Sequence, residues 1–232
     1  MGSEHVGVRS SVASLRRVAV RRPTRVGDYD GAHWAGPDLD LLESQHAAFV
    51  ALLTGLGCQV EVLDPQDGWP DAVFTYDPVF VAGHGAVQLA AAKAARVGEG
   101  EALAKDLEAI GVPTIGRLEG LATADGGDMF WWDDRTLAVG LTYRTNEAAV
   151  QQLRSLLAPQ GIEVVTYDVP HDLGPEFCLH LMSVISPVRD DLAVVYPKLA
   201  PIRLMKELDR RGIGIVEVPD DEYLTLGCNV LA

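Results

Sequence analysis

The sequence has few basic residues relative to acidic ones. Its 232 residues include 33 aspartates and glutamates but only 19 lysines and arginines, which gives a formal net charge of −14. Proteins that bind nucleic acids through phosphate contacts need a surplus of cations, so this balance argues against that class. An acidic surface favours cationic ligands, although a need for solubility explains the same surplus equally well.

Cysteines and long apolar segments are also scarce. The three cysteines, Cys58, Cys178 and Cys228, are widely spaced and odd in number, which fits neither a disulfide framework nor a zinc site. They are typical of the reducing cytoplasm, where we expect the protein to reside. The longest segment without a charged residue, 44–60, is too short and too polar to span a bilayer. The first 17 residues lack the apolar region of a signal peptide.

Motifs for cofactors are missing as well. The chain has no H-E-x-x-H sequence, no P-loop and no glycine-rich dinucleotide motif after a predicted strand. We therefore predict that the protein uses no metal and no other cofactor, and that it binds a small molecule rather than a nucleic acid or a membrane.

A repeat of about fifty residues is the most informative feature that is present. Four predicted helices end at Gly57, Gly111, Gly161 and Gly212, which are 54, 50 and 51 residues apart, and each helix leads directly into a predicted strand. Apolar residues recur at helical spacing before each glycine, and glycine suits the left-handed residue that ends a helix. The predicted inner faces are Leu42, Gln45, Phe49 and Leu52; Leu103, Leu107 and Ile110; Val150, Leu153 and Leu157; and Ile202, Met205 and Leu208.

A pair of strands precedes each of the last three helices, with turns predicted at 83–85, 133–134 and 189–191. The repeating unit is therefore strand–strand–helix–strand, with units at about 18–66, 70–117, 124–169 and 178–220. A repeat of this length favours an array or a propeller. We predict an α/β fold, a five-fold β/α propeller formed by one domain over 18–232 after a flexible N-terminus at 1–17.

The segment from 226 onward resembles the first strand of another unit. We expect a fifth unit that is truncated relative to a complete ancestor; the alternative is a natural four-unit protein whose last strand pairs with a sheet edge. An incomplete propeller exposes strand edges and apolar faces, so we also expect marginal stability or a homo-oligomer.

Polar residues gather where the predicted units begin. Asp71 and Asp77 flank one strand start, Asp125 and Asp128 flank two glycines, and His180 lies in an apolar run. Asp71, Asp125 and His180 recur at intervals of 54 and 55 residues, once per unit. In a propeller these positions converge on the axis, and several carboxylates suit a guanidinium cation. Taken singly, His180 also fits a core histidine, and Asp125 with its two glycines fits a tight turn.

These segments together resemble the dimethylarginine dimethylaminohydrolase branch of the guanidino-group-modifying, or pentein, superfamily. The resemblance rests on motifs in a fixed order along the chain. They are HWAGPD at 33–38, DAVFTYDP at 71–78, RVGEGE at 96–101, ADGGDMF at 124–130, YRTN at 143–146, LHL at 179–181 and GCNV at 227–230.

The resemblance implies hydrolysis of a C–N bond in an arginine derivative, which yields citrulline and an alkylamine. It implies that His180 is the general acid and base, and that Asp125 orients it, although Asp is shorter than the glutamate usual at this position. The segment 28–34 matches a mobile loop over the pocket. The family attacks the guanidinium carbon with a cysteine thiolate and passes through a covalent thiouronium.

The resemblance also assigns the substrate-binding residues. Asp71 and Asp77 match carboxylates that bind the substrate, and Arg96 and Arg144 match arginines that hold its carboxylate end.

None of the three cysteines occupies the position of the family nucleophile, which lies near the end of a fifth unit. We therefore interpret Cys58, Cys178 and Cys228 as structural residues and expect little or no activity from this chain. Two alternatives stay open: a non-catalytic protein that binds guanidino ligands, and an arginine deiminase or amidinotransferase.

Overall fold

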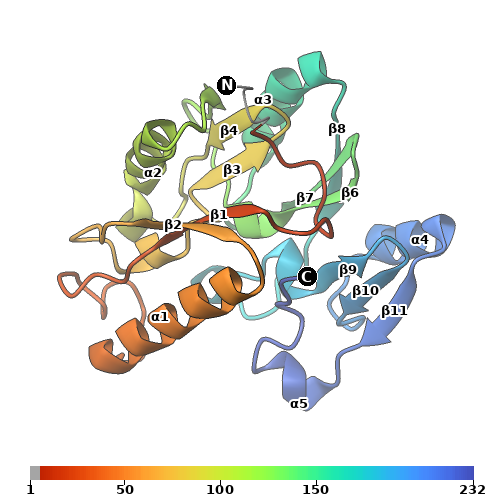
Figure 1. Cartoon of the computed structure of the whole chain (residues 1–232). Coiled ribbons are helices and arrows are strands. Elements are labelled where there is room, and N and C mark those ends of the chain that lie inside the picture. Colours follow the sequence, from red (N-terminus) through yellow and green to blue (C-terminus); the bar gives the residue numbers. More distant parts are fainter. Residues whose placement is uncertain (1–5) are drawn as a thin grey trace.

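The computed structural model of the chain describes residues 6–232 and shows a mixed α/β fold with four separate sheets (Figure 1). The first unit holds β1 (Arg17–Arg21), α1 (Leu39–Gly55) and β2 (Gln59–Leu63). The second holds β3 (Val79–Ala82), β4 (Gly85–Gln88), α2 (Glu99–Ala109) and β5 (Thr114–Arg117). The third holds β6 (Met129–Asp133), β7 (Thr136–Leu141), α3 (Glu147–Leu157) and β8 (Glu163–Asp168). The fourth holds β9 (Ile185–Arg189), β10 (Leu192–Val195), α4 (Ile202–Arg211) and β11 (Gly214–Glu217), and α5 (Asp220–Tyr223) follows.

The last three sheets share one topology, which confirms the predicted strand–strand–helix–strand order. In each, an antiparallel hairpin is followed by a helix and by a third strand that pairs in parallel with the second. The first sheet holds only β1 and β2, paired in parallel from Arg17–Gln59 to Arg21–Leu63. Figure 1 shows the sheets following one another in chain order with the helices outside them.

The four predicted helix ends are confirmed. Gly57, Gly111, Gly161 and Gly212 have φ between +67° and +92°, the left-handed region that a side chain disfavours. At its start, α3 is capped by Asn146, whose side chain accepts a hydrogen bond from the Ala149 amide.

The predicted inner faces hold for the middle helices and in part for α4, where Leu208 is buried, and fail for α1. Leu103, Leu107, Val150, Leu153 and Leu157 are buried. In α1, however, Phe49 is 40% and Leu52 58% exposed, and Leu53 is the buried residue. In α4, Ile202 is 75% exposed, while Leu204 and Leu208 are fully buried. Both helices carry apolar residues on more than one side, so helical spacing alone does not select the face that meets the sheet.

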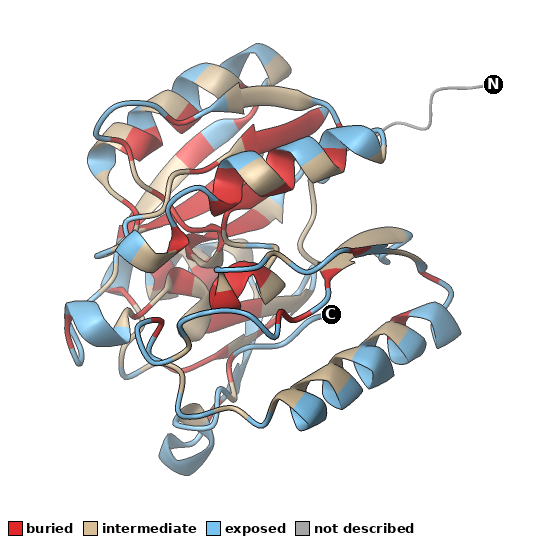
Figure 2. Cartoon of the chain, turned by 90° about the vertical axis from the view of Figure 1, so that its left-hand side faces the viewer, coloured by how far each residue is buried: buried red, intermediate tan, exposed pale blue. Residues whose placement is uncertain are grey.

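The core consists of clusters that lie between successive units. On β6, Met129 and Trp131 pack with residues of the second unit, whereas Phe130 packs with those of the fourth. This alternation follows from the two-residue period of a strand that is buried on both faces. Buried residues accordingly gather along the strands in Figure 2. A further cluster joins Leu63 of β2 to the second unit.

The polar segments that we predicted as strand starts are short 3₁₀ turns instead. These turns are Pro70–Val73, Gly126–Asp128 and Leu181–Ser183, and the strands begin after them, at Val79, Met129 and Ile185. The turns leave backbone amides free to bind buried side chains; for example, the Leu181 amide donates to Asp128. In a strand these amides would belong to the ladder.

The predicted strand after residue 226 is also wrong for the described chain. Residues 226–232 contain no strand, since no neighbouring strand pairs with them. Instead, the Ser186 hydroxyl donates to the Cys228 carbonyl at 2.5 Å, and the Val230 amide donates to the Ser186 oxygen at 3.3 Å. Cys228 is thereby buried against the fourth unit.

Of the N-terminal segment predicted to be flexible, residues 1–5 lie outside the described chain. Residues 6–16 cross the second and third units: the Gly83 amide donates to the Val8 carbonyl at 3.0 Å, and Arg9 donates to the Gln160 carbonyl at 3.1 Å. Among residues 6–232, no helix combines the length and the apolar character needed to cross a membrane.

Candidate active site

Residues that precede β3, β6 and β9, from three different units, meet at one place. The Asp77 carboxylate, before β3, accepts a hydrogen bond from the Gly127 amide at 3.0 Å. A Cβ atom built on Gly127 would lie 3.2 Å from Asp77 Oδ1 and 3.2 Å from His180 Cγ. Gly127 therefore fills the narrow space between Asp77 and His180, where any side chain would force its neighbours to shift. Close packing therefore explains why the second glycine of the ADGGD motif is a glycine.

His180 faces a carboxylate that is completely buried. Its Nδ1 atom lies 3.2 Å from Asp128 Oδ1, and Asp128 has no exposed surface. The two atoms are not aligned for a hydrogen bond, so the contact is mainly Coulombic. Asp128 Oδ2 accepts hydrogen bonds from the hydroxyls of Thr142 and Thr145 at 2.8 and 2.6 Å. These hydroxyls, one of them from the YRTN motif, fix the carboxylate beside the ring.

The charge of the imidazole follows from this arrangement. Burial by itself lowers the pKa of His180, but the negative charges of Asp128, Asp77 and Asp125 outweigh it and raise the pKa to about 9. His180 therefore carries a proton at neutral pH in the absence of ligand. A protonated imidazole that is 24% exposed at the side chain can donate that proton to a leaving group.

Asp125 lies in the same cluster, but the carboxylate in contact with the ring is that of Asp128. Burial and the charge of Asp77 raise the pKa of Asp125, and the positive charges of His180, Arg96 and Arg144 oppose the rise. Our sequence analysis gave the orienting role to Asp125 and gave none to Asp128. The signal that could have identified Asp128 is the pair of threonines that follows it, because a buried carboxylate needs such donors.

Arg96 lies in an internal ion cluster. It is 5% exposed and donates to Asp77 at 2.7 Å, to Glu99 at 2.9 Å and to the Asp71 carbonyl at 3.3 Å. Burial alone would lower the pKa of Arg96, but these acids hold it above its usual range, and burial raises the pKa of Glu99. The sequence predicted that Arg96 holds a ligand carboxylate; in the structure its donors bind the protein's own oxygens.

An open pocket of about 350 Å³ adjoins this cluster. Its lining residues are Ala32, His33, Trp34, Asp71, Phe74, Lys93, Arg144 and Glu176. Three of them belong to the segment 28–34, which we predicted to be a loop over the pocket. Trp34 of that segment stacks on Phe74 with ring centroids 5.8 Å apart. His33 Nε2 lies 3.6 Å from Glu176 on the opposite rim.

In this pocket the Asp71 carboxylate already has two partners. Trp34 Nε1 donates to Oδ1 at 2.8 Å, and Lys93 Nζ donates to Oδ2 at 2.5 Å. Sequence reasoning missed Lys93 and placed Trp34 in the loop over the pocket without giving it a contact with Asp71. Neither belongs to the repeat that identified Asp71, and they are 37 and 22 residues away from it in the chain.

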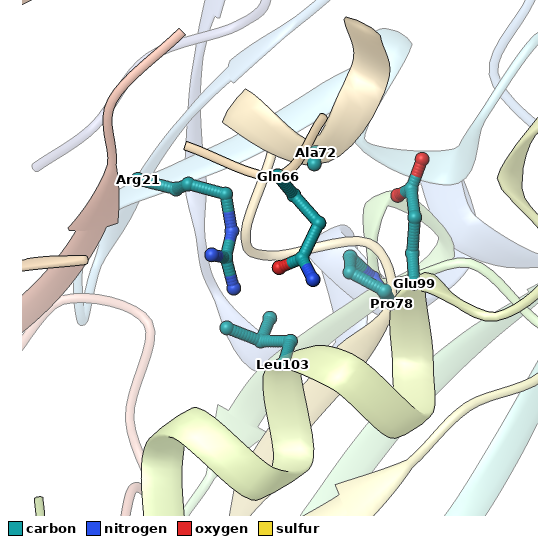
Figure 3. A pocket seen from close by; sticks show the side chains of 6 residues that line it. All are labelled: Arg21, Gln66, Ala72, Pro78, Glu99 and Leu103. Carbon is teal, nitrogen blue, oxygen red and sulfur yellow. The ribbon is translucent and has the colours of Figure 1, made fainter. Parts of the chain in front are cut away.

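A second cavity lies on the other side of the Arg96 cluster and has no room for a water molecule (Figure 3). It is lined by Arg21, Gln66, Ala72, Pro78, Glu99 and Leu103. Arg21 donates to the Asp64 carbonyl and to Asp106, each at 2.7 Å. Because it has no room for water, this cavity is a feature of the packing.

The three thiols are poorly suited to attack a substrate. Burial and the charge of Asp128 raise the pKa of Cys178 to about 11, although Arg144 opposes the rise. Burial raises the pKa of Cys228 to about 11, and the buried Cys58 thiol lies 3.4 Å from the Leu15 carbonyl. Cys178 and Cys228 therefore remain protonated thiols at neutral pH, whereas the thiolate is the reactive form.

Comparison with known proteins finds a family whose model matches most of the chain. The model of the family described as "N,N dimethylarginine dimethylhydrolase, eukaryotic" matches residues 40–232. The uncharacterized protein YkgA of Bacillus subtilis is 33% identical over 189 residues, which cover 81% of this chain and 62% of that protein. The N(G),N(G)-dimethylarginine dimethylaminohydrolase of Streptomyces coelicolor is 29% identical over 200 residues, covering 81% of this chain and 74% of the enzyme.

A solved structure shows the same fold. DDAH from Pseudomonas aeruginosa, complexed with citrulline, superposes with a TM-score of 0.75 at 21% identity, over 91% of this chain and 79% of the other. At this identity the likeness concerns the fold alone. The chain spans 62% of the length of the Bacillus relative that it matches.

Proposed function

The chain belongs to the N,N-dimethylarginine dimethylhydrolase family, and from this premise we propose that its site binds the guanidino group of an arginine derivative. Where a cysteine thiolate is supplied to this site, the proposed reaction is hydrolysis of a guanidino C–N bond to citrulline and an alkylamine. The observation that carries the proposal is the meeting of Asp77, Gly127 and His180 from three units, with Asp125 and Asp128 beside them.

Each polar side chain has a part in the proposed chemistry. The carboxylates of Asp77 and Asp125 accept N–H bonds from the planar guanidinium, which carboxylates match well. After a thiolate adds to the guanidinium carbon, His180 gives its proton to the departing amine as the C–N bond breaks. The neutral imidazole then takes a proton from water as the water attacks the thiouronium carbon, and the C–S bond breaks last. Asp128 holds the ring in place and favours its charged form.

The reaction needs a thiolate, and the described thiols do not supply one. Cys178, the cysteine nearest to His180 in the chain, has a pKa of about 11 because it is buried near Asp128. We therefore propose that the 232-residue chain by itself binds guanidino ligands without turnover, which is the pseudoenzyme alternative. In this alternative the site binds the same guanidino ligands as the hydrolase but releases them unchanged.

We also propose that the four units belong to a ring with five-fold symmetry. The sheets support this arrangement. In the three complete sheets, β3, β6 and β9 pair antiparallel with the middle strand, and no strand takes that place beside β1 among residues 6–232. A further strand would fit the free edge of β1. The free thiols support the proposed cytoplasmic location, and the free edge supports association between copies.

Calorimetry with N,N-dimethylarginine, together with an assay for citrulline, tests the proposed function. We expect saturable binding, loss of at least about tenfold in affinity for Asp77→Asn, and no citrulline. Asp209→Asn, which removes a carboxylate from the exposed side of α4, is the matched control and should bind like the parent chain. Equal binding by the Asp77 and Asp209 variants would contradict the proposed site, and robust citrulline formation would contradict the absence of turnover.

A further inference from the structure

The pocket contains a binding place for an ammonium group, and the chain's own lysine occupies it. Lys93 Nζ lies 2.5 Å from Asp71 Oδ2 and 2.8 Å from the Ala32 carbonyl oxygen. The Lys93 side chain is 18% exposed and that of Asp71 is 8% exposed. The other carboxylate oxygen binds the Trp34 indole N–H. Both Asp71 oxygens therefore already accept a hydrogen bond, and an incoming cation would compete with Lys93 for this carboxylate.

The remaining charges of the pocket favour an anion. Lys93 and Arg144 both line it. Arg144 forms no ion pair with a carboxylate anywhere in residues 6–232, in contrast to Arg96, which binds both Asp77 and Glu99. Glu176, the remaining acid, lies at the exposed rim, 3.6 Å from His33 Nε2. A ligand carboxylate in this pocket would meet two cations and would need to displace no acid from Arg144.

We propose that Lys93 determines ligand specificity, so that the pocket prefers a guanidino acid without an α-ammonium group over an α-amino acid such as dimethylarginine itself. The inference rests on the proposed function, because it takes the guanidino group to lie at Asp77 and His180. The ligand's carboxylate binds Arg144 and Lys93. An α-ammonium would be repelled by both cations, and it would compete for Asp71 with a tethered ammonium that is always present at high effective concentration.

The two kinds of ligand differ in which Lys93 contacts must be broken when they bind. A ligand without an ammonium leaves the Lys93–Asp71 and Lys93–Ala32 contacts intact. A ligand that carries an α-ammonium either leaves this group unpaired beside Lys93 and Arg144 or displaces Lys93 into solvent. Loss of a charged hydrogen bond in a partly buried place weakens binding substantially, so the expected preference is about tenfold or more.

Calorimetry with two ligands of equal length tests the inference. The probes are N,N-dimethylarginine and 5-(N′,N′-dimethylguanidino)pentanoate, which has a hydrogen in place of the α-ammonium. The chain should bind the pentanoate at least about tenfold more tightly. Lys93→Met frees Asp71 and the Ala32 carbonyl, so it should reverse the order of affinity. Lys105→Met, at an exposed position of α2, is the matched control and should keep the parent preference.

The outcomes separate the two proposals. If the parent chain binds dimethylarginine as tightly as the pentanoate, the specificity inference is overturned while the proposed function stands. An unchanged order of affinity in a folded Lys93→Met variant also overturns it. If neither ligand binds the parent chain, the proposed function fails, and the inference fails with it. Lys93→Arg keeps a cation beside Asp71 and should retain the parent preference, which provides a second variant if Lys93→Met does not fold.

Discussion

Asp128 and His180 belong to successive units of the fold, yet their side chains meet, with Nδ1 3.2 Å from Oδ1. The contact explains why the imidazole is charged at neutral pH, and the structure shows how it is maintained. Two threonine hydroxyls and the Leu181 amide hold the carboxylate in place.

Asp128→Asn should lower the pKa of His180 towards its ordinary value. The change removes the nearest negative charge, while burial of the ring, which favours the neutral form, remains. NMR titration of the imidazole should show a fall from about 9 by at least about one unit. Asp125→Asn should lower the same pKa by less. A larger fall in the Asp125 variant would restore Asp125 to the orienting role that the resemblance implies.

The stability of the folded chain should decrease between pH 6.5 and 9. His180 has its pKa raised from 6.5 to about 9 by folding, so its proton stabilises the folded state. That contribution is complete below pH 6.5 and is lost as the pH rises through 9, by on the order of 3 kcal/mol in total. Denaturant unfolding at several pH values measures it. His180→Gln should remove this part of the pH dependence, and a parallel decline in both proteins would show that His180 is not its source.

Gly127→Ala should destabilise the protein and disturb the site together. The added Cβ would lie 3.2 Å from both Asp77 Oδ1 and His180 Cγ, so the two side chains must separate. We expect a loss of about 1–3 kcal/mol in the free energy of unfolding and a changed pKa of His180. Gly55→Ala, where the new atom would touch nothing within 4 Å, should be neutral or slightly stabilising. Equal effects at the two glycines would contradict the close approach at Gly127.

Two leucines that are adjacent in α1 should differ strongly in their effect on stability. Leu53 is 5% exposed and Leu52 is 58% exposed. Leu53→Ala should therefore cost about 2–3 kcal/mol and Leu52→Ala less than about 0.5 kcal/mol. Chemical unfolding of both variants measures this difference. A larger loss of stability for Leu52→Ala than for Leu53→Ala would contradict this and support the inner face with Leu52 that apolar spacing predicted.

The repeat was readable from the sequence because its signals are local. A glycine that ends a helix, and the strand that follows it, depend on residues a few positions apart, and all four such ends are present. The inner face of α1 was not readable, because Leu52 and Leu53 both fit a helical pattern and only the sheet decides between them. The short turns before β3, β6 and β9 were mistaken for strands because they contain apolar residues. The pattern of side chains does not reveal that a backbone amide such as that of Leu181 binds a buried carboxylate.

The site was readable only in part for a related reason. The repeat identified Asp71, Asp125 and His180, because each unit places a polar residue at the same point. Asp128 and Lys93 act through partners that are 52 and 22 residues away, and such pairings depend on how the units pack. Arg96 shows the same dependence on packing: two nearby acids bind its guanidinium, while its contact with a ligand carboxylate stays a prediction.

The most direct test of the central claim, that three units together form one guanidinium site, is an NMR titration with N,N-dimethylguanidine. This probe carries neither a carboxylate nor an ammonium, so it reports on the guanidinium site without involving Lys93 or Arg144. The account predicts saturable shifts of the Gly127 amide and of the His180 imidazole, both lost in Asp77→Asn. Saturation confined to signals elsewhere in the chain, or shifts that persist unchanged in Asp77→Asn, would contradict it.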